Sequence, residues 1–423
     1  MKNFKLKDEN GRIYMGWYIT LMGIILMTFA YSCVVSVAGQ FMLPVTEDLG
    51  IQIGDFSLWM TILRLTAIVF LLFFSKIFSK KTVKKIMIIA CICGVVGFVG
   101  FGTSSSLIQF YLSSVVLGIC FAGLTTTPCT LLVSNWFGPA MRGKALGILF
   151  GGNSIAICIF IPILNLIIQT FGWRWAYFIL AGILLVICLP MILKLTKWSP
   201  DDLGIRRMGD GVSEEVDAEK LEGISFKEGL KKPSTWIMFL TGTLLVIPSS
   251  AILAHSQPFM VMHGYSPTFA STVTSIMIGI CLVTCIMVGA IKDKFGLRAA
   301  AIFTGIAFIL AYVSQIYIPT GGMIMVLGFI LFYGLGCPAV NIVSPLFANH
   351  MFGDKEVGAF IGYINMFISV GGAFGSSIVG KMYDASGSYI TAFWMCAALL
   401  AIMTILRFIL SGSKFSYKNR KGL

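Results

Sequence analysis

The chain has 423 residues, of which 57% are hydrophobic and only 12% charged, with a formal net charge of +13. Soluble domains carry about 25% charged residues, so this composition excludes an ordinary soluble domain and indicates a polytopic membrane protein. Its basic residues cluster in short loops between apolar runs, which is a signal of membrane topology and not of nucleic-acid binding. We therefore expect a lipid bilayer as the surroundings and no nucleic-acid partner.

Apolar runs of spanning length follow one another along the chain. The first begins at Gly16 and is too long for the core of a cleaved signal peptide. The runs lie at 16–41, 56–76, 84–103, 107–134, 145–169 and 174–194, and then at 234–257, 267–291, 298–318, 321–349, 357–380 and 388–410. The sequence thus predicts an all-α polytopic membrane protein, with 12 transmembrane helices in two pseudo-symmetric six-helix bundles, residues 1–194 and 233–423.

The polar stretch between the halves, residues 195–232, mixes basic and acidic side chains and is too short for a catalytic domain. We interpret it as a flexible cytoplasmic linker, with a short amphipathic helix near Glu214 to Leu230. If the N-terminus is cytoplasmic, only Arg174 and Lys381 among the basic residues fall in outside loops, as the positive-inside rule requires. Both termini are then expected in the cytoplasm and the chain in the plasma membrane.

Arg64 is the one charged side chain that the sequence places deep inside an apolar run. It lies roughly 12 Å below the Asp55 end of its span, near the middle of a hydrocarbon core about 30 Å thick. A charge there is costly unless it faces a polar cavity or a partner, so Arg64 is a candidate substrate contact. The alternative is an arginine whose long side chain reaches the headgroups.

Other candidate substrate contacts are polar or aromatic residues at mid-span. They are Tyr31, Thr126, Asn153, His255, Asn341, Tyr363 and Asn365. Small polar residues within spans more often hold helices together than bind ligands, which is the alternative for each of them. His255 stands out because an imidazole titrates near neutral pH, although a structural role is the competing interpretation.

No metal or cofactor is predicted. Eleven cysteines lie in or near apolar runs, with no C-x-x-C pair and no clustered histidine, and are interpreted as small buried apolar residues. The motifs H-E-x-x-H and G-x-S-x-G are absent, as is any intramembrane acidic pair, so we do not expect an enzyme.

Two six-helix halves joined by a cytoplasmic linker resemble the architecture of the major facilitator superfamily. The segment GAIKDKFGLR resembles the cytoplasmic G-x-x-x-D-x-x-G-x-R signature of that family, which implies a gating role for Gly289, Asp293, Gly296 and Arg298. Asp293 would pair with a cation and accept from a neighbouring helix N-terminus. In the equivalent first-half loop, SKIFSKKTVKK, Ser75 and Ser79 replace the expected Gly and Asp, so the halves are expected to latch unequally.

Further segments resemble the oxalate/formate antiporter and monocarboxylate porter branch. These are NWFGPAMRGKALGI at 135–148, GWRWAYF at 172–178, WSPDDLG at 198–204 and GGAFGSSIVGKMYDASGSYITAF at 371–393. The first contains Arg142, interpreted as a gating residue, with a purely structural turn as the alternative. Carriers of this branch are expected to hold a basic residue in the eighth span, yet no charge lies between Pro267 and Ala290. Either Arg64 replaces that anchor or the substrate is not a small carboxylate.

The functional prediction is a secondary transporter that moves a small organic anion, a carboxylate, by alternating access. Because no Asp or Glu lies inside a span, we expect antiporter-like exchange or facilitated flux over obligatory proton symport. The alternatives are transport of a larger amphipathic compound, such as a bile salt or drug, and a membrane receptor without transport. The partners expected are a small-molecule substrate and the bilayer, with the protein a monomer.

Overall fold

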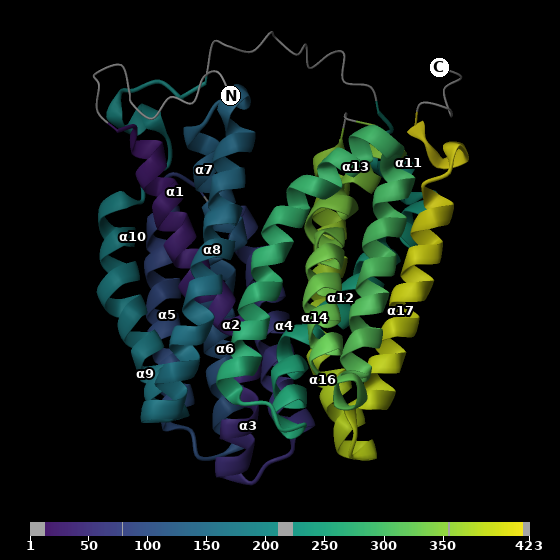
Figure 1. The fold of residues 1–423 in the computed structure, drawn as a ribbon. Helices are drawn as coiled ribbons and strands as arrows, with labels where there is room; N and C mark the ends of the chain where they lie inside the picture. Colours follow the sequence, from purple (N-terminus) through teal and green to yellow (C-terminus); the bar gives the residue numbers. More distant parts are fainter. Residues whose placement is uncertain (1–12, 78, 210–222, 354–355, 418–423) are drawn as a thin grey trace. The chain divides into compact units, whose positions relative to one another are not determined.

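The computed structural model describes residues 13–77, 79–209, 223–353 and 356–417. Nearly all of these residues are helical, and within them the only β-type pairing is two isolated bridges (Figure 1). The predicted all-α fold is confirmed.

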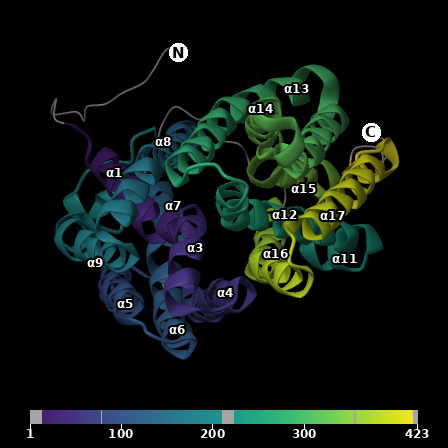
Figure 2. The same cartoon turned by 60° about the horizontal axis from the view of Figure 1, so that its bottom comes forward.

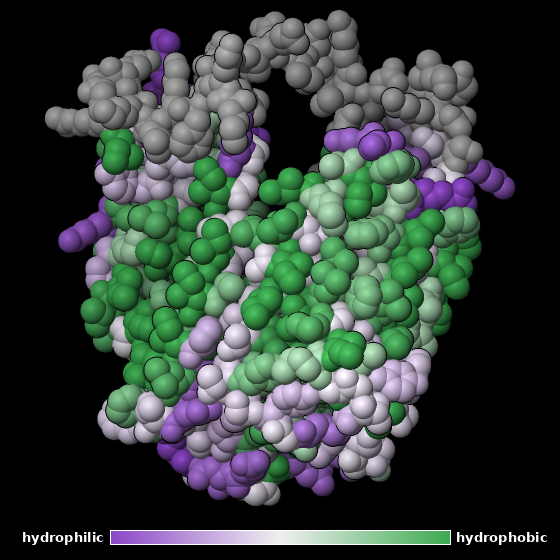
Figure 3. All heavy atoms as spheres, viewed as in Figure 1, coloured by the Kyte–Doolittle hydropathy of each residue, from purple (hydrophilic) through white to green (hydrophobic). Residues whose placement is uncertain are grey.

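Ten helices in the described residues are long and apolar enough to cross a membrane. The longest, α13 (Pro267–Ile316), contains two of the predicted spans, because Gly296 interrupts it with a φ of 86°. The first predicted span is instead divided into shorter pieces between Met15 and Leu49. With α13 divided and this first segment included, the twelve predicted spans are all present. Figure 3 shows a broad hydrophobic band on the face drawn, with hydrophilic residues at its ends.

The first of two compact units comprises residues 1–38 and 62–216. In it α5 packs against α6 and α9 (Figure 2), and an aromatic cluster that includes Phe101, Phe110 and Tyr177 fills the space between these helices. The elements of this unit, together with most of α4 (Ile53–Ile77), are α1 (Met15–Leu26), η1 (Met27–Ser32), α2 (Cys33–Val35), α5 (Val83–Thr103), α6 (Leu107–Leu124), α7 (Thr126–Trp136), α8 (Pro139–Phe171), α9 (Trp173–Ile183), η2 (Leu184–Cys188), α10 (Leu189–Leu195) and η3 (Pro200–Leu203).

The second unit comprises residues 39–61 and 217–423, so it includes the first turns of α4. Here α12 packs against α16 and α17. The elements are α3 (Ala38–Leu49), α11 (Phe226–Leu230), α12 (Pro233–Met262), α13, α14 (Ile318–Gly336), η5 (Ala339–Val343), α15 (Ser344–Phe352), α16 (Val357–Ser386), α17 (Tyr389–Leu410) and η6 (Ser413–Phe415). The domain boundaries drawn from the sequence, at 194 and 233, stay a prediction.

Hydrogen bonds hold the end of the linker that precedes α12. At residues 223–232 the backbone N–H of Ile224 donates to the Phe352 carbonyl oxygen at 2.8 Å, and that of Phe226 donates to Glu356 Oε2 at 2.6 Å. The helix expected near 214–230 is α11, capped by Ser225, and the rest of that stretch up to residue 222 lies outside the described residues. We call the end of each unit where the linker attaches the linker end, and the opposite end the far end.

Candidate functional site

Arg64 lies near the middle of α4 and is half-buried. No carboxylate in the described part of the chain forms an ion pair with its guanidinium. The phenol of Tyr31 lies within electrostatic range of it. Arg64 is therefore a cation within a candidate membrane span, near a neutral hydroxyl.

Tyr31 belongs to η1, a π-helical turn inside the first span. Such turns occur often at functional sites, because the extra residue changes which side chains face inward. The ring of Tyr31 lies 5.5 Å from that of Phe121 on α6, centroid to centroid. The same turn carries Thr28, whose hydroxyl donates to the Ile24 carbonyl oxygen and lies 3.3 Å from Asn153 Oδ1 on α8. The structure thus brings Arg64 and Tyr31 together, with Asn153 against the same π-helical turn.

Thr126 follows a break at Thr125, where ψ is −141°, and starts α7. Its side chain is half-buried, and no described contact joins it to Arg64. Thr125, the deeper neighbour, donates from Oγ1 to the Phe121 carbonyl oxygen at 2.6 Å. This hydroxyl supports the kink between α6 and α7.

His255 on α12 is completely buried in the second unit. Its Nε2 lies 2.8 Å from the Ser376 carbonyl oxygen, and its Nδ1 lies 3.3 Å from the Tyr389 hydroxyl. Both ring nitrogens are therefore occupied by protein groups, which favours the structural interpretation of this histidine.

Three other candidates belong to the second unit. Asn341 belongs to η5, another π-helical turn. Tyr363 and Asn365 are exposed on α16, and the ring of Tyr363 lies 4.7 Å from that of Phe226 in α11. Tyr363 is thus placed at the linker end.

The residues of the predicted gating motif lie at the turn within α13. Gly296 makes the turn with its positive φ, and Gly289 lies two turns earlier in the helix. The carboxylate of Asp293 lies 3.0 Å from Nζ of its neighbour Lys292 and is largely exposed. The Arg298 guanidinium lies 3.7 Å from the centroid of the Phe408 ring on α17. Arg142, the gating candidate of the other unit, is exposed in the first turn of α8.

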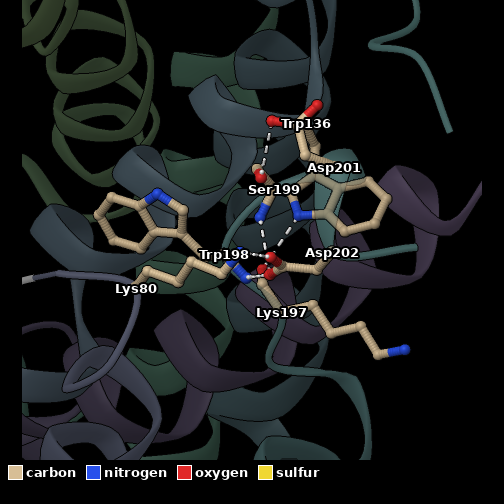
Figure 4. Close-up of polar contacts among 7 residues, drawn as sticks. All are labelled: Lys80, Trp136, Lys197, Trp198, Ser199, Asp201 and Asp202. Carbon is tan, nitrogen blue, oxygen red and sulfur yellow. Dashed lines mark hydrogen bonds and ion pairs between the residues drawn. The ribbon is translucent and has the colours of Figure 1, made fainter. Parts of the chain in front are cut away.

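Figure 4 shows a polar cluster at the linker end of the first unit that the sequence did not predict. Nζ of Lys80, in the first-half loop that lacks the motif, lies 2.5 Å from Asp202 Oδ1. The other carboxylate oxygen accepts from the backbone N–H groups of Trp198 and Ser199 at 3.0 and 3.4 Å. The hydrogen bond from Lys80 lowers the pKa of Asp202. The capping pattern S-x-x-D inside WSPDDLG was the available signal.

A second buried arginine, Arg407, lies in the last turn of α17, at the end of its predicted span. Arg407 in α17 is only 2% exposed, and it donates from Nη1 to the Ala339 carbonyl oxygen at 3.1 Å and from Nη2 to Ser344 Oγ at 2.7 Å. Because it lies three residues before the end of α17, the sequence assigned it to the basic tail.

The far end of the second unit joins the start of α4 to α16. Lys381 forms an ion pair with Asp55, and the backbone N–H of Gly54 donates to Asp384 Oδ2 at 2.9 Å. A Cβ added at Gly380 would lie 2.8 Å from the Gly54 Cα, so the two backbones touch. Deeper along the helices, Thr61 Oγ1 lies 2.6 Å from Ser377 Oγ.

A family model described as Major Facilitator Superfamily matches residues 21–349, most of the chain. The chain belongs to the major facilitator superfamily. It is therefore a multi-pass membrane transporter that carries a small-molecule substrate, and not an enzyme. The resemblance stated from the sequence motifs is confirmed at this level.

Curated relatives agree with this assignment. An uncharacterised major facilitator transporter, YcxA of Bacillus subtilis (strain 168), is 22% identical over 382 residues, covering 87% of this chain and 89% of the relative. Monocarboxylate transporter 12 of Homo sapiens is 24% identical over 338 residues, covering 72% of this chain and 62% of the relative. The relationship to the monocarboxylate branch thus holds at low identity.

Solved structures share the fold. The nucleoside transporter NupG has a TM-score of 0.73 at 14% identity, over 94% of this chain and 99% of its own. A bacterial homologue of the human lysosomal transporter Spinster has a TM-score of 0.71 at 15% identity, over 96% of this chain and 98% of its own. At such identities the likeness concerns the fold alone.

Proposed function

We propose that this transporter moves a small organic anion, a carboxylate, by alternating access, with Arg64 as the principal contact. The observation that carries the proposal is the half-buried guanidinium of Arg64, which no described carboxylate neutralises. Such a charge is costly within a membrane, so a helix retains it where it has a use.

The chemistry of the neighbours supports an anion. The guanidinium is a planar fork of donors that matches the two oxygens of a carboxylate. The Tyr31 hydroxyl is able to donate a hydrogen bond to the same anion, and the Phe121 ring beside it supplies an apolar wall. Asn153, against the same π-helical turn, is the next candidate contact.

The relatives named as monocarboxylate transporters support the carboxylate class. The charge-free stretch between Pro267 and Ala290 then means that Arg64 takes over the anchoring role expected in the eighth span. We further propose exchange or facilitated flux as the transport mode, and a monomer in the plasma membrane with both termini in the cytoplasm.

The test begins with a ligand screen on purified protein, in which carboxylates, bile salts and cationic drugs are compared by thermal shift. A ligand that binds only the folded protein raises its apparent stability. We expect carboxylates to stabilise the protein. Stabilisation by cationic drugs alone would contradict the proposal.

The affinity of the stabilising carboxylate is then measured for Arg64→Lys, Arg64→Gln and Arg64→Ala. Losing one charge-assisted contact is worth roughly 1.5 to 3 kcal/mol, about a 10- to 150-fold weaker affinity. Lysine keeps the charge without the fork, so we expect Arg64→Lys to bind weakly and the two neutral variants to bind least. The two neutral variants should fold, because removing an unpaired intramembrane charge relieves a cost, and Arg64→Lys leaves that charge in place.

A matched control is Arg174→Gln, which removes an arginine stacked on the Trp173 ring at the start of α9. This change is expected to leave the affinity unchanged. Unchanged affinity in Arg64→Ala, at equal amounts of folded protein, would show that the arginine only reaches the headgroups.

A further inference from the structure

The side chain of Arg407 joins α17 to both ends of the π-helical turn η5. Its Nη1 donates to the carbonyl oxygen of Ala339, the first residue of the turn, at 3.1 Å. Its Nη2 donates at 2.7 Å to Oγ of Ser344, the residue that follows the turn. One planar group with a fixed spacing between its donors therefore brackets the whole turn.

The helix is short of backbone donors at this point. Pro338 precedes η5 and Pro345 follows it, and a proline has no N–H to give to the helical ladder. The Ala339 carbonyl oxygen accepts from Arg407 Nη1 and, at 3.1 Å, from Ser344 Oγ. Side chains thus hold the first carbonyl oxygen of the turn, beside two positions that lack a backbone donor.

The guanidinium is held without a counter-ion. No carboxylate forms an ion pair with Arg407 among the described residues, and within them its Nε has no hydrogen-bond acceptor. The Phe347 ring centroid lies 5.6 Å from its Cζ, and the side chain is too buried to meet a ligand. Burying a charge costs more free energy than burying a neutral donor, and a neutral donor would be enough for a single carbonyl oxygen. The charged, two-pronged group therefore has a geometric role.

We propose that Arg407 is a positioning residue, which keeps residues 339–343 in π-helical register and thereby sets which way position 341 faces. Asn341 is one of the candidate substrate contacts, so the consequence for binding rests on the proposed function. The effect of Arg407 on the helical register does not depend on the proposed function.

The register is tested without any substrate, by cysteine labelling. Single cysteines are placed at positions 340, 341, 342 and 343 of a protein that lacks its native cysteines, and each is labelled with a membrane-permeant maleimide. The four cysteine variants are made in three backgrounds, which carry the native Arg407, Arg407→Lys or Arg407→Met. Loss of the extra residue of a π turn rotates the helix on one side by about 100°.

In Arg407→Met we expect the most reactive position to shift by one residue, and in Arg407→Lys the native pattern to be largely restored. The matched control Lys294→Met removes an exposed charge from α13 and should keep the native pattern. An unchanged pattern in Arg407→Met would overturn the proposal.

Should Arg407→Met yield no folded protein, Ser344→Ala gives the same information. Ser344→Ala removes the hydroxyl that accepts from Arg407 Nη2 and leaves α17 unchanged. A shifted labelling pattern in this variant supports the proposal, and an unshifted pattern overturns it.

The link to binding is tested by a double-mutant cycle of Arg407→Lys and Asn341→Ala, with the affinity of the carboxylate found by the screen. In the Asn341→Ala background we expect Arg407→Lys to cause no further loss of affinity. Additive losses would contradict the link to Asn341. Failure of the Arg64 experiment leaves the labelling pattern unaffected, so the two proposals fail separately.

Discussion

Arg64 and Arg407 both lie inside apolar helices, and they differ in what receives their donors. A charged side chain at the centre of a spanning helix costs about 2.5 to 3.5 kcal/mol on insertion scales. Arg407 directs its Nη groups at two protein oxygens, whereas Arg64 has the neutral Tyr31 within electrostatic range and no ion-pair partner among the described residues. One arginine is thus committed to the fold, and the other is the residue that the proposed function assigns to the anion.

The cluster around Asp202 yields a prediction at the same scale. Asp202→Asn or Lys80→Gln removes the ion pair and weakens the attachment of residues 197–203 to the loop before α5. Because Lys80 is exposed to solvent, which screens the ion pair, the change in the free energy of unfolding should be small. Amide hydrogen exchange of Trp198 and Ser199 should nevertheless become faster. Lys81→Gln is the matched control, and equally fast exchange in that variant would remove the assigned role of Lys80.

The pH dependence of this cluster follows from the directions of the two pKa shifts. The pKa of Asp202 is lowered by the hydrogen bond from Lys80, so its contribution is present above the ordinary carboxyl range and is lost as pH falls through the lowered value. The pKa of Lys80 is raised by the same hydrogen bond, so its contribution is lost only as pH rises through the raised value. The cluster should therefore persist across neutral pH.

At the scale of elements, the ion pair between Asp55 and Lys381 predicts a charge-swap result. Asp55→Lys places like charges at the far end of α4 and α16, and should open the contact between them. Because both side chains are partly exposed, we expect an effect of about 0.2 to 1 kcal/mol. The reporter is a cysteine at position 377, where the native serine is 5% exposed.

Labelling at position 377 should be faster in Asp55→Lys and return toward the native rate in the double variant Asp55→Lys/Lys381→Asp. Fast labelling that persists in the double variant would show that the charge pair does not hold the contact.

Hydropathy predicted the helices well and their interruptions poorly. The predicted span 56–76 became α4 at Ile53–Ile77, and 388–410 became α17 at Tyr389–Leu410. The turns η1 and η5 were not predicted, because apolar composition records neither the spacing of backbone hydrogen bonds nor the distant side chains that support them. The carbonyl of Ala339, for example, receives its donor from Arg407, in another helix.

At the scale of the whole molecule, the sidedness of the chain is the principal open prediction. Single cysteines at positions 210 and 386, in a background without native cysteines, should react from the cytoplasmic and outer sides respectively. The reason is that basic residues concentrate in the loops on the linker's side. Reaction of both positions from the same side would contradict twelve spans.

The candidate site was predicted only in part, for a geometrical reason. Position along a span gives the depth of a residue but not the face of the helix on which it lies. Arg64, Tyr31 and Asn153 lie around one π-helical turn of the first unit. His255 and Tyr363 were both predicted at mid-span. The ring nitrogens of His255, however, lie against Ser376 and Tyr389, and the ring of Tyr363 packs against Phe226 at the linker end.

The meeting of Gly54 and Gly380 also has a thermodynamic consequence. Two backbones that touch without side chains immobilise no rotamers when they come together, so this contact escapes the entropy loss that ordering a longer side chain would impose. Its favourable part comes from dispersion and from the hydrogen bond of the Gly54 N–H to Asp384. A backbone junction of this kind therefore forms and separates with a small change in conformational entropy.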